Sequence, residues 1–172
     1  MGEIRNREFF TCDAVELAKN LVGKVLCHKV GKGKDEFVIK ARIFTTEAYL
    51  ENESFTDANR AKEANSQELV GGHIHFHNAA EGRRRMDIVA NEAGITQSVL
   101  IAECDMYDGP QKTLWALDAD DKKYDGLDLV TSDEIWLEDD GVTVELKDAT
   151  QRKNIADTAL LRFSARSFTF KQ

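Results

Sequence analysis

Three histidines at alternate positions form the densest group of potential metal ligands in the chain. On a β-strand His73, His75 and His77 would share one face, because side chains alternate along a strand. The His-x-His spacing occurs in metal sites, and imidazole suits Zn, Cu, Ni or Fe. The sequence identifies no carboxylate partner for them. We therefore expect no metal or other cofactor, and keep a metal-dependent protein as the minor alternative.

A glutamate and a tyrosine two residues apart are the second candidate group. Glu47 and Tyr49 lie in IFTTEAYL, a segment with strand character, so both side chains would point to the same side. A carboxylate can orient and deprotonate water, and its charge can stabilise a developing cation. Taken alone, however, a strand carboxylate is usually solvated and a strand tyrosine usually packs in a core.

Composition favours one domain spanning residues 1–172, with no apolar run long enough to cross a bilayer. The N-terminus lacks a secretory signal, and three widely spaced cysteines indicate no disulfide framework. We therefore expect a monomer in the cytoplasm, at the bacterial nucleoid, or in a nucleus. The net charge of −8 counts against a large nucleic-acid footprint. Arg83, Arg84 and Arg85 form the densest basic run, which would give a local basic strip.

Periodicity predicts the elements that would position these residues. Residues 13–22 fit an amphipathic helix, with Asp13 as its N-cap and Gly23 at its end. Further helical segments are predicted at 60–69 and 112–118. Strands are predicted at 24–30, 37–49, 73–77, 84–90, 97–104, 134–140, 142–146 and 161–170, the first two forming a hairpin. This mix predicts an α+β domain, a curved, mostly antiparallel sheet with peripheral helices.

Five segments together resemble the alkyladenine (methylpurine) DNA glycosylase family. They appear in the family's order and at about its spacing, and they are FFTCDAVELAKNLVGKVL, IFTTEAYL, GPQKTLWALD, DLVTSDEIWLED, and QRKNI followed by LLRF. The family flips a damaged purine out of duplex DNA and hydrolyses its N-glycosidic bond. The resemblance therefore implies a monofunctional glycosylase in base excision repair. Its partner would be double-stranded DNA containing an alkylated or deaminated purine.

The resemblance also implies roles for individual residues. Glu47 would activate the water, and Tyr49, His75, His77 and Asp87 would contact the flipped base. Stacking of about 1–3 kcal/mol per base would offset the cost of flipping. The DNA-contacting residues would be basic: Arg83, Arg84, Arg85, Lys112 and Arg152. Arg162 also matches a family position, where it would touch a phosphate or pair internally.

Several family residues are replaced. Ala80 stands where the family inserts a tyrosine into the duplex, and an arginine plane of the 83–85 run can substitute for it. Asp87 replaces a base-selecting asparagine, Ala102 a phosphate-contacting arginine, and Ala58 or Asp57 a histidine. The alternative is a catalytically altered or inactive member that binds DNA or a protein. The enzyme hypothesis requires Glu47 to face a cleft and not to be locked in an internal ion pair.

Overall fold

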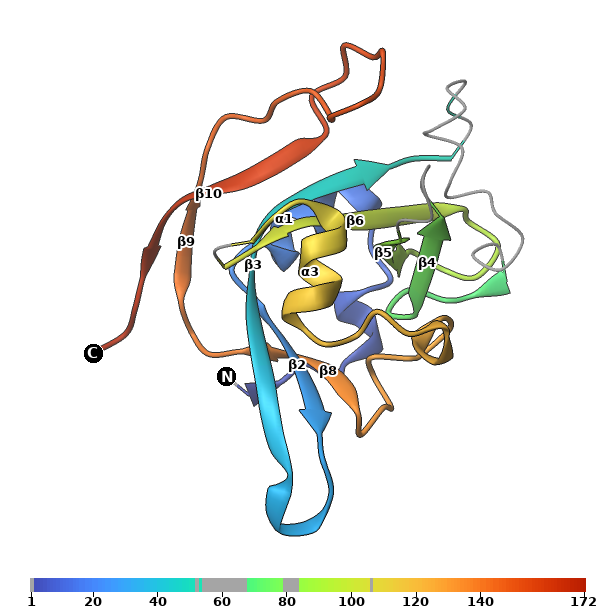
Figure 1. The fold of residues 1–172 in the computed structure, drawn as a ribbon. Coiled ribbons are helices and arrows are strands. Elements are labelled where there is room, and N and C mark those ends of the chain that lie inside the picture. Colours follow the sequence, from blue (N-terminus) through green and yellow to red (C-terminus); the bar gives the residue numbers. More distant parts are fainter. Residues whose placement is uncertain (1, 52, 54–67, 79–83, 106) are drawn as a thin grey trace.

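The strands form one strongly curved antiparallel sheet, against which the helices α1 and α3 pack (Figure 1). The computed structural model describes residues 2–51, 53, 68–78, 84–105 and 107–172. Within these ranges the sheet has ten strands, and their bounds are β1 Gly2–Glu3, β2 Val25–Val30, β3 Phe37–Tyr49, β4 Ile74–Asn78, β5 Arg84–Ala90, β6 Gln97–Cys104, β7 Tyr107–Asp108, β8 Ile135–Asp139, β9 Thr143–Leu146 and β10 Arg162–Thr169. The α+β prediction is confirmed.

Helix α1 (Ala14–Leu21) has the predicted cap and the predicted buried face. The side chain of Asp13 accepts a hydrogen bond from the backbone N–H of Val15 at 2.8 Å. Four apolar residues at helical spacing are fully buried against β3 and β6, namely Ala14, Leu17, Ala18 and Leu21. Burial of this stripe is what holds a helix of only eight residues in place.

Strand β3 is the central strand of the sheet, because β2, β6 and β10 all pair with it. It pairs with β2 as the predicted hairpin, whose turn contains a short 3-10 helix at Gly33–Asp35. Its second half lies between β6 and β10, so Glu47 has Leu100 on one side and Arg162 on the other. The hairpin extends away from the body of the sheet, while the far end of β3 runs across it (Figure 1). The far end carries Glu47 and Tyr49.

The remaining elements differ from the sequence predictions in detail. Helix α3 (Pro110–Ala116) begins two residues before the predicted start, because a proline fits the first turn, where its missing N–H has no partner to lose. Strands β8 and β9 follow one another in the sequence but do not pair, since β8 pairs with β1 and β2 whereas β9 pairs with β10. Two further 3-10 helices cover Arg7–Phe9 and Lys122–Tyr124. The helix predicted at 60–69 lies almost entirely outside the described residues.

One main core joins the two helices to the concave sheet. All three cysteines are free, and two of them are buried. Burial raises the pKa of the Cys27 thiol to about 12 and that of Cys104 to about 11, so both behave as inert apolar side chains. None of the described helices is long and apolar enough to cross a membrane.

Candidate active site

Glu47 is buried and its carboxylate is held by three donors. It is 2% exposed. The hydroxyl of Tyr49 donates to Oε1 at 2.9 Å. Arg162 Nη1 and the backbone N–H of Lys153 donate to Oε2 at 2.7 and 3.0 Å. A carboxylate offers about four acceptor positions, so one remains, on Oε1.

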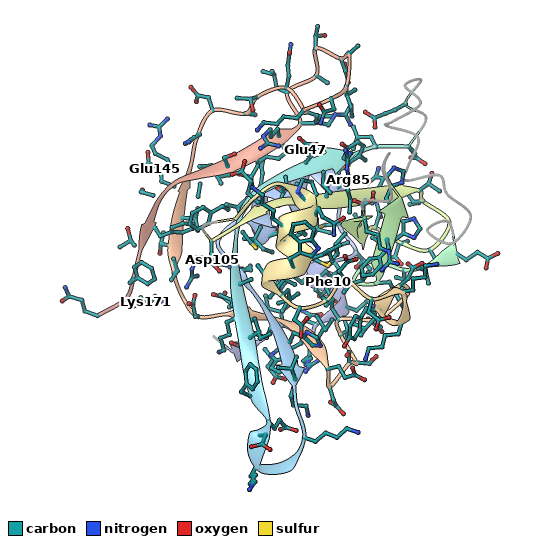
Figure 2. All side chains as sticks on the ribbon, viewed as in Figure 1. Phe10, Glu47, Arg85, Asp105, Glu145 and Lys171 are labelled. Carbon is teal, nitrogen blue, oxygen red and sulfur yellow. The ribbon has the colours of Figure 1, made fainter. Side chains whose placement is uncertain are left out.

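The carboxylate forms part of the wall of a small cavity. Glu47 and Arg85 lie close together near the start of α3 (Figure 2). The cavity has a volume of ≈ 60 Å³, and its wall is formed by Glu47, Arg85, Leu100, Ala102, Gly109, Pro110, Lys153, Asn154 and Arg162. Since one water takes up about 30 Å³ in the liquid, this space suits about two water molecules and is too small for a purine.

The two conditions placed on Glu47 have opposite outcomes. The residue does face a cavity, as the enzyme hypothesis requires. It also forms a buried ion pair with Arg162, which that hypothesis excluded. The pairing leaves the carboxylate oriented but offsets part of its charge.

Tyr49 is covered by a buried arginine. The guanidinium of Arg152 lies 4.8 Å from the centre of the Tyr49 ring, which is itself 1% exposed. Arg152 pairs with Glu53 at 2.7 Å and Asp157 at 2.6 Å, and donates to the carbonyl of Ala48. Burial opposes the charge of this arginine, but these carboxylates raise its pKa above the usual value.

This arrangement contradicts the phosphate contact predicted for Arg152. Its side chain is fully buried and ion-paired with two carboxylates of the chain, so it is not available to a DNA backbone. It also occupies one side of the tyrosine ring on which a base was expected to stack. A base can reach that side only after Arg152 has moved.

The histidines do not converge on a common point. His73 Nδ1 lies 2.7 Å from the carbonyl oxygen of Val70, and its Nε2 lies 3.9 Å from Asp128. His75 is buried, with Nδ1 3.6 Å from an oxygen of Asp125. Among the described residues, no group of three or more histidine, cysteine, aspartate or glutamate side chains is placed to hold a metal ion. The geometry therefore gives no support to the metal alternative.

The other predicted base contacts lie on the neighbouring hairpin. Asp87 is fully buried on β5, opposite His75 on β4 and Leu100 on β6. His77 is half-buried and faces Arg85 across the two strands. Their contact with a base stays a prediction.

Of the predicted basic strip, one side chain reaches the cavity. Arg85 lines it and has no ion-pair partner in the described part of the chain. Arg84 instead pairs with Asp120 at 3.2 Å, and Lys112 is exposed on α3. Arg83, together with Ala80, Asp57 and Ala58, lies outside the described residues.

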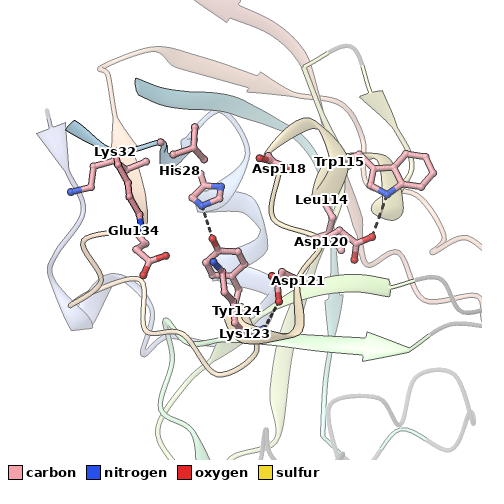
Figure 3. A pocket seen from close by; sticks show the side chains of 13 residues that line it. His28, Lys32, Leu114, Trp115, Asp118, Asp120, Asp121, Lys123, Tyr124 and Glu134 are labelled. Carbon is pink, nitrogen blue, oxygen red and sulfur yellow. Dashed lines mark hydrogen bonds between the residues drawn. The ribbon is translucent and has the colours of Figure 1, made fainter. Parts of the chain in front are cut away.

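A separate polar groove of ≈ 930 Å³ shares no residue with the wall around Glu47. It lies beside the β2–β3 hairpin and the segment after α3 (Figure 3). Its buried histidine, His28, is already bonded to the carbonyl of Leu117 and the hydroxyl of Tyr124. Its lining residues include no buried and oriented carboxylate comparable to Glu47.

Sequence patterns did not indicate two residues of the site, Glu103 and Lys153. Glu103 and Lys153 escaped notice because one contributes through an irregular strand pairing and the other through its backbone N–H. Arg162 was singled out only by its place in the LLRF segment. Its partner became visible in the β3–β10 register, where it stands directly opposite Glu47.

Comparison with known proteins shows to which family this α+β chain with its buried carboxylate belongs. Residues 8–107, more than half of the chain, match the family model described as Methylpurine-DNA glycosylase (MPG). The chain belongs to that family.

Individual relatives match over shorter stretches. A Pseudomonas syringae pv. tomato protein named "Putative 3-methyladenine DNA glycosylase" is 41% identical over 76 residues, which are 43% of this chain and 32% of that protein. A Chlorobium phaeobacteroides protein of the same name is 30% identical over 105 residues, covering 59% of this chain and 51% of that protein. The chain thus spans about a third to about half of the length of these relatives.

Proposed function

We propose that this chain is a monofunctional DNA glycosylase that releases an alkylated or deaminated purine from duplex DNA as a single-domain monomer. The observation that carries the proposal is the Glu47 carboxylate, buried at a cavity and held by three donors with one acceptor position left. Family membership supports the substrate class, since the curated relatives are named for 3-methyladenine. With DNA as its partner, the protein would act at a bacterial nucleoid or in a nucleus.

In this proposal Glu47 acts on the attacking water. Its remaining acceptor position holds the water, which attacks C1′ of the flipped nucleotide and passes a proton to the carboxylate. The bond from C1′ to the purine nitrogen breaks, and the electron pair leaves with the base. Negative charge beside C1′ stabilises the cationic sugar as the base departs. A purine alkylated at N3 or N7 is already cationic, so one carboxylate suffices for it.

Arg85 is the best candidate for a DNA contact at the cavity. It is a half-buried cation at the rim, unpaired within the described residues, on a chain that is acidic overall. A phosphate of the flipped nucleotide would supply the missing partner.

Two observations favour a second candidate, a family member that binds DNA without releasing a base. The cavity is smaller than a purine, and Arg152 covers the ring of Tyr49. Base release requires both to change when DNA binds. The second candidate requires neither.

Substitution of Glu47 by glutamine separates the two candidates. Duplexes carrying 3-methyladenine, 7-methylguanine, hypoxanthine or ethenoadenine are incubated with the protein, and alkali-sensitive sites are counted. We expect wild-type protein to produce such sites and Glu47→Gln to lower the rate by a factor of about 100 or more. Equal rates would remove Glu47 from the mechanism. DNA binding without base release from any duplex would establish the second candidate.

A further inference from the structure

Arg162 is shared between two carboxylates. Its Nη1 donates to Glu47 at 2.7 Å, and its Nη2 donates to Glu103 Oε1 at 2.8 Å. The other oxygen of Glu103 accepts from the hydroxyl of Thr45 at 3.1 Å. Each nitrogen of the guanidinium fork is thus committed to a different partner.

Two irregularities in the pairing of β3 with β6 bring Glu103 to this position. The register passes from Ile43 opposite Cys104 to Thr45 opposite Glu103, and then to Thr46 opposite Ile101. Phe44 and Ala102 are therefore extra residues, one in each strand. A bulge re-aims the side chains beside it. Regular alternation would put Glu103 on the core side with Ile101, but here it lies on the same side as Glu47.

Arginine and a carboxylate commonly pair through both nitrogens and both oxygens. If Arg162 paired with Glu47 in that way, it would take up the acceptor position left on Oε1. Glu103 holds the second nitrogen and so keeps the contact to a single bond. It also leaves the group of two carboxylates and one guanidinium with a net charge of −1, whereas Glu47 and Arg162 alone would be neutral.

We propose that Glu103 is a positioning residue that restricts Arg162 to one contact with Glu47 and thereby keeps Glu47 charged toward the cavity and open to water. This inference rests on the proposed role of Glu47 and adds the group that makes an ion-paired carboxylate usable.

The test compares Glu103→Leu and Glu103→Gln with a matched control, Glu138→Leu. Glu138 lies on β8, outside the cavity wall, and is comparable in exposure and in its 2.8 Å ion pair, which it makes with Lys40. Two abasic duplexes serve as probes, one with a cationic pyrrolidine and one with a neutral tetrahydrofuran in place of the sugar. Their affinity ratio reports negative charge beside C1′ without any turnover.

We expect wild-type protein and Glu138→Leu to bind the cationic duplex more tightly than the neutral one. Glu103→Leu loses about tenfold of this preference, which is the effect of one unit charge about 12 Å away at an effective dielectric of about 20, while its affinity for the neutral duplex is unchanged. Glu103→Gln retains an acceptor for Arg162 and falls between the two. In a crystal structure of Glu103→Leu, Arg162 contacts both oxygens of Glu47.

The proposal is overturned if Glu103→Leu keeps the full preference, or if Arg162 keeps its single contact with Glu47 in that crystal structure. Single-turnover base release, measured on the same variants, separates this failure from failure of the proposed function. If wild-type protein releases no base, but the charge preference is found and Arg162 contacts both oxygens of Glu47 in Glu103→Leu, the proposed function fails and the positioning role stands. If wild type and Glu103→Leu release base equally fast, the proposed function stands and the positioning role fails.

Discussion

At the residue scale, the centre of the site is built from charged groups that are paired with one another inside the protein. Glu47 is held by Arg162, and Tyr49 is covered by Arg152, which itself pairs with Glu53. Buried ion pairs add little net stability, but breaking one is costly because a charge is left without its partner. Such pairs fix orientation, and a water-activating carboxylate needs a fixed orientation.

Arg152 provides the clearest test of this cost. We expect Arg152→Met to lower the free energy of unfolding by about 3–5 kcal/mol, because Glu53 and Asp157 are then left beside the buried ring of Tyr49. Urea unfolding at pH 7 measures the change. Arg166→Met is the matched control, because the Arg166 side chain is half-exposed and forms a looser ion pair, at 3.5 Å from Glu145. This substitution should cost less than about 1 kcal/mol. Equal losses in both variants would contradict a stabilising role of the buried ion pairs of Arg152.

At the element scale, local patterns predicted what depends on near neighbours. The amphipathic stripe with Asp13 gave α1, and two apolar runs around a polar turn gave the β2–β3 hairpin. The bulges at Phe44 and Ala102 were not predictable, because nothing in either strand by itself states which residues its partner will skip. The Glu47 side of the site was therefore foreseen, whereas its connection to Glu103 was not.

The end of α1 allows a test in which conformation and contact are separated. Gly23 has φ +90°, and a Cβ there would overlap the side chain of Val144 on β9. Gly94 has φ +91° with open space around it. We expect Gly94→Ala to cost about 1 kcal/mol from backbone strain, and Gly23→Ala to cost about 1–3 kcal/mol more, because β9 must shift. Thermal or urea unfolding gives both numbers. Similar losses of unfolding free energy in the two variants would mean that β9 shifts without a measurable cost.

At the scale of the whole molecule, the charge of −8 sits on a protein proposed to act on DNA. Several arginines are paired within the chain: Arg7 with Asp128, Arg42 with Asp140, and Arg84 with Asp120. These arginines are not free to contact phosphates. Affinity for DNA should therefore depend on a few side chains such as Arg85, and fall less steeply with salt than that of a basic DNA-binding protein.

The same pairing sets the response of stability to acid. A hydrogen bond from Arg42 lowers the pKa of Asp140 below its usual 3.8, and the backbone N–H of Gly141 does the same for Asp139. The pKa of Asp128 is also lowered, where burial is outweighed by Arg7 and a backbone N–H. A carboxyl whose pKa is lower in the folded state stabilises the fold above its unfolded pKa. That contribution is lost as the pH falls through the folded value.

From pH 7 to 5 we therefore expect constant or slightly rising stability, because the net negative charge declines toward the pI of about 5.1 while these carboxyls stay ionised. Below about pH 4 stability should fall, by on the order of 1–3 kcal/mol after allowing for solvent screening of partly exposed pairs. Urea unfolding at pH 7, 5 and 3 tests this. Arg42→Met should be less stable at pH 7 and lose less than wild type between pH 5 and 3, because Asp140 then has no partner to give up. An equal loss in both proteins would show that the Arg42–Asp140 pair does not contribute to the acid response.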